Sequence, residues 1–415
     1  MSETADPRLV TRIALRNYKS IAACDVPLAP LSFLVGPNGC GKSNFLDALR
    51  FVAEALRFSL DHALRDRGGI QEVRRRSGGH PNHFGIRLDL QLPSATGWYA
   101  FRVAAKPGGR YSVQREECVV FGADERGSYR VADGKVIDST IPNPPACASD
   151  RLYLVNMSGF DLFRRVYDAL SGMGFYNLNP DAIRDLQAPD PGDLLKRDGS
   201  NLASVLANLG SRKTDVEEYL AAITPGVTGV DSRTMGTKLT LDFRQEVRGA
   251  KHPWRFLASN MSDGTLRALG VLVALFQGNG EVMERRHLVG IEEPESALHP
   301  AAAGVLVDSL TDASQLAQVV VTSHSAELLD NDAIPDSSIL AVLSEHAETR
   351  IGPLDDAGRS ALRDHLFTAG ELLRMDQLHP DPAQSAPRQL DLFERAHSAP
   401  DAVTCLAERR AELIG

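Results

Sequence analysis

The sequence predicts an α/β fold with a mixed β-sheet, and three features of the chain carry this prediction. Residues 31–35 form a short apolar run that ends at a glycine-rich loop, and an amphipathic stretch follows at 42–57. Two more apolar runs, 287–291 and 318–322, have the length of buried strands and are separated by a helical pattern. Between residues 84 and 121, apolar and polar residues alternate, which is typical of half-buried strands.

The other elements follow from the same periodicities and from the positions of proline and glycine. The expected strands cover residues 10–15, 31–35, 85–92, 97–103, 110–120, 237–246, 287–291 and 318–322. The expected helices cover residues 42–57, 265–277, 301–317 and 402–414. Residues 150–222 are expected to mix helices with loops, and prolines in 376–388 predict a flexible linker.

Composition and charge exclude several classes of protein. Apolar residues make up 43% of the 415-residue chain, which is enough for a packed core, so intrinsic disorder is not expected. The net charge of −9 argues against a protein that coats nucleic acid, because such a protein would be basic. No apolar window reaches the length of about 18 residues that a membrane span needs, so we expect no membrane partner.

The cysteines and the N-terminus indicate a cytoplasmic protein. The cysteines are scattered, odd in number and contain no C-x-x-C pair, which favours reduced thiols over disulfides or a zinc site. They are Cys24, Cys40, Cys118, Cys147 and Cys405. The first residues are acidic and lack the apolar segment of a signal peptide.

The glycine-rich loop matches the phosphate-binding pattern G-x-x-x-x-G-K-[ST]. It reads Gly36-Pro37-Asn38-Gly39-Cys40-Gly41-Lys42-Ser43, and Asn44 continues it into the helix. Backbone N–H groups of such a loop face the phosphates of a nucleotide, and the start of the following helix adds positive potential. Lys42 is expected to reach the β- and γ-phosphates, and Ser43 to ligate Mg²⁺. A glycine-rich turn beside a surface lysine is the alternative.

An acidic pair and a histidine follow the two later apolar strands. Glu292 is expected to hold Mg²⁺, directly or through water, and Glu293 to polarise the water that attacks the nucleotide. His324 follows the next strand, where it can hydrogen-bond the γ-phosphate and sense its loss. The alternatives are a strand that runs into a charged loop and a histidine with a structural role.

Ser262, Asp263 and Gly264 precede the helix at 265–277 and can form a second anion site. One subunit does not need two γ-phosphate sites, so we expect two subunits to pair head to tail, each presenting this loop to the ATP of the other. A plain helix N-cap is the alternative. Residues 296–300 are expected at the seam of this dimer, or otherwise as a helix start with proline in its first turn. Residues 76–80, Arg-Ser-Gly-Gly-His, also combine serine with glycine as this loop does, and we interpret them as a glycine-rich turn.

The combined pattern resembles the ABC-type ATPase heads of the SMC and RecF group, most closely the RecF-like and OLD-like stand-alone ATPases. The resemblance rests on the phosphate loop, on Asn-Tyr-Lys-Ser-Ile at 17–21 and on Glu-Glu-Pro-Glu-Ser-Ala-Leu-His-Pro at 292–300. It covers about residues 8–92 and 236–345. SMC heads usually carry Asp-Glu where this chain has Glu292-Glu293, and a glycine at the position of Asp263.

The resemblance implies an α/β P-loop NTPase, with an ABC-ATPase-like head, a mixed β-sheet and an inserted, mainly helical lobe. In these terms the chain divides into four regions. They are an N-terminal ATPase lobe with the phosphate loop (Walker A) at 8–121, an inserted and partly helical lobe at 122–235, a C-terminal ATPase lobe with the signature loop, the acidic pair (Walker B) and the His-switch at 236–375, and a linker with a terminal helix at 376–415.

The activity that the resemblance implies is hydrolysis of ATP to ADP and phosphate, with Mg²⁺ as cofactor. OLD-family proteins carry a Toprim nuclease after the ATPase. We assign Asp330 and Asp332, which closely follow His324, to a solvated loop and expect no Toprim domain. The favoured hypothesis is a homodimeric switch, closed over two ATP molecules, that controls a separately encoded nuclease or toxin in anti-phage defence.

The alternative is a RecF-like, ATP-dependent DNA clamp in DNA repair. A basic patch would then hold the DNA, and the candidate residues are Arg65, Arg67, Arg74, Arg75 and Arg76. A solvated charged face is the other interpretation of these arginines. A transporter motor is disfavoured, because the insertion between the phosphate loop and the signature loop is long and no glutamine of a Q-loop is evident.

Overall fold

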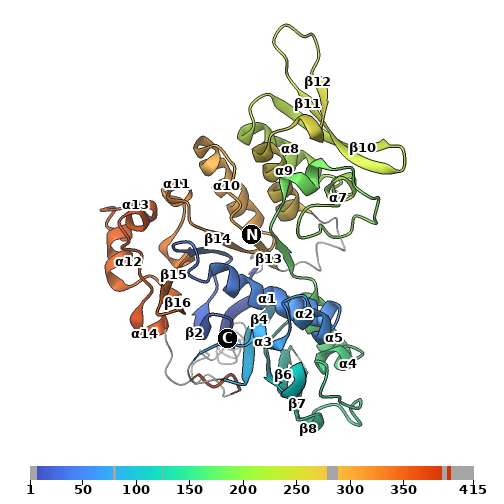
Figure 1. Cartoon of the computed structure of the whole chain (residues 1–415), viewed down its shortest axis with the longest axis vertical. Coiled ribbons are helices and arrows are strands. Elements are labelled where there is room, and N and C mark those ends of the chain that lie inside the picture. The colour runs from blue at the N-terminus through green and yellow to red at the C-terminus, as the bar shows by residue number, and fades with distance from the viewer. Residues whose placement is uncertain (1–6, 78–80, 124, 278–287, 386–389, 394–415) are drawn as a thin grey trace, which may run out of the picture.

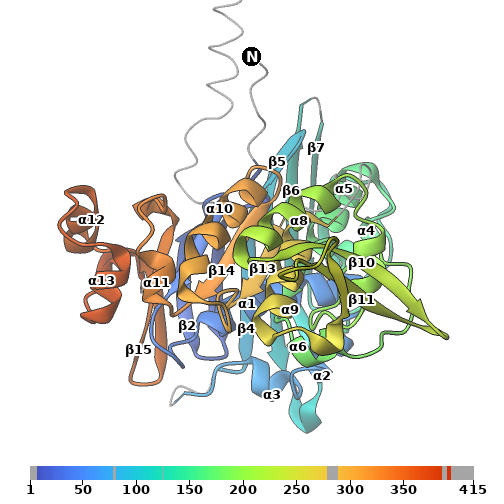
Figure 2. The ribbon, with the colours of Figure 1, turned by 90° about the horizontal axis from the view of Figure 1, so that it is seen from above.

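The computed structural model describes residues 7–77, 81–123, 125–277, 288–385 and 390–393. Two large β-sheets enclose one helix, α1, and further helices cover the outer face of one of the sheets (Figures 1 and 2). No helix in the described part of the chain is long and apolar enough to cross a membrane. The four cysteines in that part of the chain, Cys24, Cys40, Cys118 and Cys147, are unpaired thiols.

The central sheet has six strands in the order β16-β15-β3-β14-β13-β9, and all neighbours except β15 and β16 run parallel. Its strands are β3 (Leu31–Val35), β9 (Gly174–Tyr176), β13 (Leu288–Glu292), β14 (Gln318–Ser323), β15 (Ile339–Glu345) and β16 (Glu348–Pro353). Both β3 and β14 are buried along their whole length, as expected for parallel strands that are covered on both faces. The predicted apolar strands therefore form the centre of the fold.

The second sheet has seven antiparallel strands in the order β2-β1-β4-β5-β6-β7-β8. Its strands are β1 (Val10–Tyr18), β2 (Ile21–Pro27), β4 (His83–Leu92), β5 (Ala95–Ala105), β6 (Tyr111–Gly122), β7 (Arg126–Ala132) and β8 (Lys135–Ser139). The sequence prediction missed β2, β7 and β8, which have few large apolar residues. A third sheet contains β10 (Val227–Met235), β11 (Lys238–Gln245) and β12 (Trp254–Leu257).

The helices are short except where they pack on the sheets. Those of the first half are α1 (Lys42–Arg57), α2 (Leu60–Arg65), α3 (Ile70–Val73), α4 (Leu154–Met157), α5 (Asp161–Ser171), α6 (Pro180–Arg184) and α7 (Leu202–Ala207). Those of the second half are α8 (Arg212–Ile223), α9 (Asp263–Phe276), α10 (Ala303–Ser314), α11 (Ala326–Leu329), α12 (Asp356–Arg363), α13 (Ala369–Arg374) and α14 (Pro382–Ser385). The described residues also contain four 3₁₀ turns, which are η1 (Pro107–Gly109), η2 (Ala258–Asn260), η4 (Pro300–Ala302) and η5 (Asp336–Ser338).

Alternating side chains of the central sheet build two separate cores. Leu34, Leu288 and Val320 face the core that contains α1 and the antiparallel sheet. Phe33 and Val319 face the core that contains α8, α9 and α10. Helix α1 has the predicted bounds, because its apolar residues recur at the helical period and meet a sheet on each side.

The predicted domain boundaries at residues 121 and 235 stay predictions, and a pair of neighbouring strands spans each of them. Strand β6 pairs with β7 across residue 121, and β10 pairs with β11 across residue 235. Within 122–235, helices α4 to α8 accompany four strands. The expectation of a flexible linker fails for residues 376–385, because Leu378 and Ser385 are buried and α14 packs on β16 and β2. The terminal helix expected at 402–414 lies outside the described residues.

A buried carboxylate fixes α1 to the segments on either side of it. The Tyr18 hydroxyl donates a hydrogen bond of 2.8 Å to Asp47 Oδ2, and Lys19 Nζ lies 2.6 Å from the same oxygen. Arg67 Nη2 lies 2.8 Å from Asp47 Oδ1. Burial by itself raises the pKa of Asp47, but the charges and hydrogen bonds of Arg67, Lys19 and Arg50 outweigh burial and hold that pKa well below its usual range.

Asp47→Asn is expected to destabilise the fold, because the guanidinium of Arg67, only 2% exposed, loses its main partner. We expect the free energy of unfolding to fall by about 3 kcal/mol at pH 7. The pKa of Asp47 is lower in the folded protein than in the unfolded chain, so the ionised carboxylate stabilises the fold above about pH 5. This contribution is lost as the pH falls and Asp47 becomes protonated. The difference between the two proteins in urea denaturation should therefore shrink at pH 3.5.

Asp61→Asn is the matched control, because Asp61 forms an exposed ion pair with Arg65. It should change the free energy of unfolding by less than about 0.5 kcal/mol. An Asp47→Asn protein as stable as the control at pH 7 would contradict this account of Asp47.

Candidate functional site

The phosphate loop connects β3 to the start of α1. No side chain caps the start of this helix. Lys42 Nζ donates hydrogen bonds to the carbonyl oxygens of Gly36 at 2.7 Å and of Pro37 at 3.0 Å. Ser43 is exposed beside it. The predicted anion site therefore lies at a helix start, and its lysine is held by the loop's own backbone.

Strands β15 and β16 pack closely against this loop, which explains why two of its positions are glycines. A Cβ on Gly36 would lie 2.0 Å from the carbonyl oxygen of Val342 in β15. Gly41 has a φ of 108°, and a Cβ there would lie 2.2 Å from Thr349 Oγ1 in β16. The same hydroxyl donates to the carbonyl of Cys40 at 2.8 Å. Ser20 Oγ lies 2.7 Å from Thr349 Oγ1 and accepts a bond from Asn44, so the loop is supported from β16 and from the β1–β2 turn.

Parallel register brings the other predicted residues to the same edge of the sheet. Val35 pairs with Ser323, and Thr322 pairs with Glu292. The carboxyl ends of β3, β14 and β13 are therefore level. The phosphate loop, His324 and the acidic pair consequently follow three adjacent strand ends.

Glu293 is held by contacts to both its backbone and its side chain. Its backbone is left-handed, with a φ of 46°, and its N–H donates to the carbonyl of Thr322 at 3.0 Å. His324 Nδ1 lies 3.3 Å from Glu293 Oε1, and Ser296 Oγ donates to Oε2 at 3.3 Å. A non-glycine residue in this conformation persists only where its surroundings determine it. The carboxylate is thus fixed beside the histidine.

Glu292 has a partner that the sequence did not indicate. Arg197 Nη2 lies 2.6 Å from Glu292 Oε1. Arg197 belongs to the segment between α6 and α7, and its carbonyl accepts a hydrogen bond from Asn177, the residue after β9. Because β9 pairs with β13, this segment lies alongside the acidic pair.

The predicted signature loop forms the start of α9. Ser262 is the N-cap, and its Oγ accepts a hydrogen bond of 3.2 Å from the N–H of Thr265. Within one chain, Ser262 is therefore a plain helix N-cap, as in the alternative interpretation. A contact between this loop and the ATP of a partner subunit stays a prediction. Asp263 pairs with Arg184. A Cβ on Gly264 would lie 2.5 Å from the carbonyl of Ala297, so this loop packs against the 296–300 segment of its own chain.

Arg267, in the first turns of α9, links that helix to the acidic pair. Its Nη2 donates to the carbonyl of Glu292 at 3.2 Å and to the carbonyl of Glu293 at 3.0 Å. Its Nη1 donates to the carbonyl of Leu178 at 2.6 Å. The signal for it in the sequence is a single cation inside the otherwise apolar helix. Thr349 and Arg197 gave no such signal, because their partners are distant in sequence.

Pro300 stands in the first turn of η4, and His299 caps that turn by accepting a hydrogen bond from Ala301 at 3.2 Å. This is the helix start of the alternative interpretation.

The expectation of a solvated loop fails for Asp330, which pairs with Arg374 at 2.7 Å, whereas Asp332 is exposed. The described residues contain no cluster of three or more His, Cys, Asp or Glu side chains that could hold a metal ion.

The predicted basic patch is not a free cationic surface. Arg65, Arg67, Arg75 and Arg76 each pair with a carboxylate, and Arg74 donates to Gln71 Oε1. The charges of Arg65, Arg67, Arg75 and Arg76 are therefore matched within the chain, whereas the partner of Arg74 is a neutral amide. The glycine-rich string at 76–80 lies partly outside the described residues.

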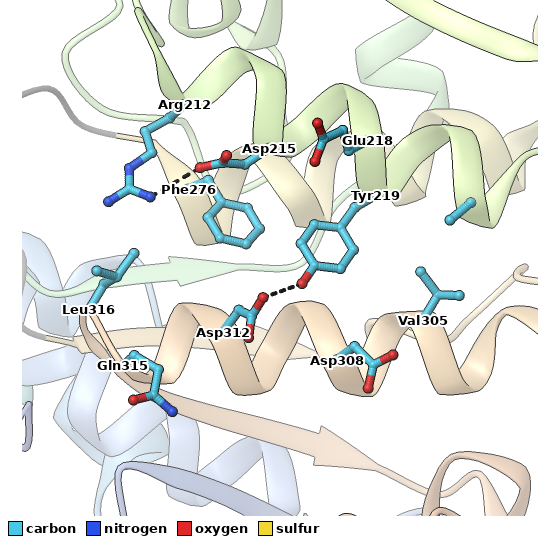
Figure 3. A pocket seen from close by; sticks show the side chains of 11 residues that line it. Arg212, Asp215, Glu218, Tyr219, Phe276, Val305, Asp308, Asp312, Gln315 and Leu316 are labelled. Carbon is cyan, nitrogen blue, oxygen red and sulfur yellow. Dashed lines mark hydrogen bonds and ion pairs between the residues drawn. The ribbon is translucent and has the colours of Figure 1, made fainter.

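A separate pocket of about 570 Å³ lies between α8, the end of α9 and α10 (Figure 3). Tyr219 stacks on Phe276 there and donates a hydrogen bond to Asp312. The other carboxylates of its lining are Asp215, Glu218 and Asp308. None of the predicted nucleotide-site residues lines this pocket, and its carboxylates would repel a triphosphate.

Two family models match the chain. Residues 166–330 match the family described as "AAA domain, putative AbiEii toxin, Type IV TA system", and residues 9–84 match "AAA ATPase domain". Among curated proteins, the DNA replication and repair protein RecF of Vibrio vulnificus strain YJ016 is 36% identical over 50 residues, which are 12% of this chain and 14% of that protein. RecF of Photorhabdus laumondii is 49% identical over 41 residues, which are 10% and 11% of the two chains. The matches thus span a small part of these relatives.

Two solved structures share the fold over most of both chains. An Smc head bound to the C-terminal winged-helix domain of ScpA has a TM-score of 0.52 at 14% identity and covers 83% of this chain and 96% of its own. An Smc head with an extended coiled coil, bound to the C-terminal domain of ScpA derived from Pyrococcus furiosus, has a TM-score of 0.52 at 11% identity, with 86% and 99% covered. The chain has the fold of an ABC-type ATPase head of the RecF and SMC group.

Gly36→Ala is expected to displace the phosphate loop, because the new Cβ would meet backbone that cannot rotate away. We expect a loss of about 1–3 kcal/mol in the free energy of unfolding, measured by urea denaturation. Gly304→Ala is the control: Gly304 lies in α10 with nothing closer than 4.0 Å to an added Cβ, so this change should be neutral or stabilising. Equal stability of the two variants would contradict the close contact between β15 and the loop.

Proposed function

We propose that the chain binds and hydrolyses ATP as a head that closes with a second copy and switches a separate effector protein. The observation that supports this proposal most is the level ending of β3, β14 and β13. It puts a phosphate loop, a histidine and two carboxylates at one edge of the sheet. This combination of a phosphate cradle with an acid pair is what phosphoryl transfer to water requires.

The loop residues Gly36 to Asn44 would hold the triphosphate through backbone N–H groups, with Lys42 turning from its two carbonyls toward the phosphates. Ser43, which is exposed at the start of α1, and Glu292 would hold Mg²⁺, because that ion prefers oxygen ligands. Bound Mg²⁺ neutralises charge on the phosphate oxygens. Arg197 would share Glu292 with the ion and limit how negative the site becomes.

Glu293 would accept a proton from the attacking water, and its fixed backbone holds the carboxylate in place for that step. His324, 3.3 Å from that carboxylate, would donate to the γ-phosphate through its other ring nitrogen. Loss of the γ-phosphate would then leave the histidine with the carboxylate alone. These two residues therefore form the catalytic pair of the proposal.

Ser262, Asp263 and Gly264 would contact the ATP of the second copy in a head-to-tail dimer. The start of α9 offers N–H groups suited to an anion, and within its own chain it lies against the 296–300 segment. Exposed Ala297, His299 and Pro300 suit a position at the seam between the copies.

A separately encoded nuclease or toxin, acting in anti-phage defence, would receive the output of this cycle. The family model over 166–330 is described as a putative toxin of a type IV toxin–antitoxin system, which supports a place for this chain in a two-component system. The Smc heads, whose titles record a bound ScpA domain, support a protein partner. A RecF-like DNA clamp in repair is the second candidate, which the short RecF matches support.

Glu293→Gln is expected to trap the ATP-bound dimer, because binding is retained while the proton acceptor is lost. Light scattering with ATP and Mg²⁺ should then give twice the monomer mass, and phosphate release should fall at least about 100-fold. Glu218→Gln, the same change at an exposed position of α8, should behave as the unmodified protein. Lys42→Ala should bind no ATP and stay monomeric. A Glu293→Gln protein that stays monomeric in saturating ATP would refute the head-to-tail mechanism.

Arg267→Ala is expected to lower kcat with little effect on ATP binding. Arg267 donates hydrogen bonds to the backbone carbonyls of the acidic pair, and among the described residues its hydrogen bonds do not reach the phosphate loop. Misplacing a catalytic carboxylate by about 1 Å can cost about 100-fold, so we expect a fall of 10- to 100-fold in turnover. The Kd for ATP, measured by calorimetry, should change by less than about threefold. Arg363→Ala, at an exposed ion pair, is the control. Equal losses in kcat and in affinity would contradict a positioning role.

A further inference from the structure

The short helices that follow His324 form a small unit at the edge of the central sheet. Residues 326–338 contain α11 and η5, and residues 355–376 contain α12 and α13. We call these two stretches the α11–α13 module. Figures 1 and 2 both show α12 and α13 at the margin of the molecule, beyond β15. Of the residues given a role at the nucleotide site, none lies in this module.

The turn between α12 and α13 exposes two large apolar side chains next to each other. Leu366 is 66% exposed and Phe367 is 44% exposed. Their N–H groups both donate to the carbonyl of Ala361, at 3.0 Å and 3.4 Å, so the backbone holds the turn in place. Single apolar residues are common on protein surfaces, but a fixed turn that presents a leucine beside a phenylalanine is typical of an interaction site.

A pocket of about 310 Å³ lies beside this turn. Leu329, Ile334 and Leu362 line it together with Leu366 and Phe367. Its volume is at the lower end of the range of about 300–1,000 Å³ that binding pockets have. An apolar pocket of this kind suits one large side chain of a partner protein, because such anchor residues supply most of the affinity at interfaces.

The α11–α13 module is strongly acidic. It contains nine Asp and Glu residues against three arginines and no lysine, and so carries most of the net charge of −9 of the chain. Each of the three arginines pairs with an acid of the module. Asp332, in the lining of the pocket, and Asp364, beside the exposed turn, form no ion pair with a described residue. This charge repels a nucleic acid or an anionic lipid surface and attracts a basic protein.

Helix α11 connects the pocket to the nucleotide site, because it begins two residues after His324. A Cβ on Gly370 in α13 would lie 2.2 Å from the carbonyl oxygen of Ala326, so α13 packs on α11 without space between them. Asp330, at the end of α11, accepts a hydrogen bond of 2.6 Å from Thr368, at the start of α13. A displacement of His324 in the proposed ATP cycle would therefore act on the pocket through two packed helices.

We propose that the pocket beside the α12–α13 turn is the docking site of the effector protein, which inserts one large apolar side chain and surrounds it with lysine or arginine residues. Leu366 and Phe367 would pack on the apolar face of the inserted segment, and Asp332 and Glu371 would pair with its cations. An amphipathic helix with a basic polar face has this chemistry. That the partner is the effector rests on the proposed function, whereas the docking surface itself does not require ATP.

The test uses full-length proteins without nucleotide and three labelled synthetic peptides, with binding measured by fluorescence anisotropy. The first peptide repeats leucine and phenylalanine at helical spacing among lysines. The second has glutamate in place of lysine, and the third has serine in place of the apolar residues. Both should bind to the unmodified chain at least about tenfold more weakly than the first peptide does.

Leu366→Ser/Phe367→Ser should weaken binding of the first peptide at least about tenfold, since both apolar contacts are lost. Phe58→Ser/Ile137→Ser is the matched control, because these side chains are 61% and 59% exposed on other parts of the surface. It should bind the first peptide as the unmodified chain does. Thermal unfolding verifies that each variant is folded.

Several results would overturn the proposal. They include no binding of the first peptide by the unmodified chain, equal binding by the two variants, and glutamate peptide that binds as tightly as the lysine peptide. A tenfold gain in affinity after Leu406→Ser/Leu413→Ser would make the C-terminal segment of this chain the occupant. A dimer that light scattering detects without ATP, and that is lost in Leu366→Ser/Phe367→Ser, would make a second copy the occupant.

Nucleotide experiments separate this inference from the proposed ATPase. ATP turnover of the Leu366→Ser/Phe367→Ser protein should equal that of the unmodified chain, so lost peptide binding with normal turnover refutes the docking site alone. Intact peptide binding without any turnover refutes the ATPase alone. In the Glu293→Gln protein, saturating ATP and Mg²⁺ should change the affinity for the first peptide at least about fivefold. An unchanged affinity would refute the connection through α11.

Discussion

The parallel register of β3, β14 and β13 is the constraint on which the rest of the site depends. Hydrogen bonds between these strands make their carboxyl ends level, so three short loops that are far apart in the sequence meet at one edge. Each strand is buried on both faces, which leaves little freedom for a slip in register. Every proposed role at the nucleotide site follows from where these three strands end.

Two further features keep that edge in place. On one side, Asp47 joins α1 to the segments before and after it, and Thr349 and Ser20 support the loop that begins α1. On the other side, Arg267 connects α9 to the carbonyls of the acidic pair. Because α9 begins at the signature loop, a displacement of that loop by the ATP of a second copy would act on the acidic pair through Arg267 and through the 296–300 segment. The same link would couple the two nucleotide sites of a dimer.

Local sequence predicted the parts of the molecule that depend on local patterns. The strand 31–35, the helix 42–57 and the residues at the three strand ends could be found because apolar periodicity and the phosphate-loop spacing are short-range signals. Strands β2, β7 and β8 could not, since few large apolar residues mark them. Arg197 and Thr349 were missed because each acts on a residue distant in sequence. The ion pairs within the basic patch were missed for the same reason: the partners of Arg67 and Arg75 lie elsewhere in the chain.

The central claim is that the signature loop of one copy faces the phosphate loop of another when ATP is bound. Cross-linking tests it most directly, with Ser262→Cys on one copy and Asn38→Cys on the other, mixed as two single variants and treated with a short bismaleimide. The account predicts a cross-linked dimer that forms with ATP in a Glu293→Gln background and is lost without ATP. An ATP-induced dimer in which these two positions never cross-link would contradict the head-to-tail arrangement.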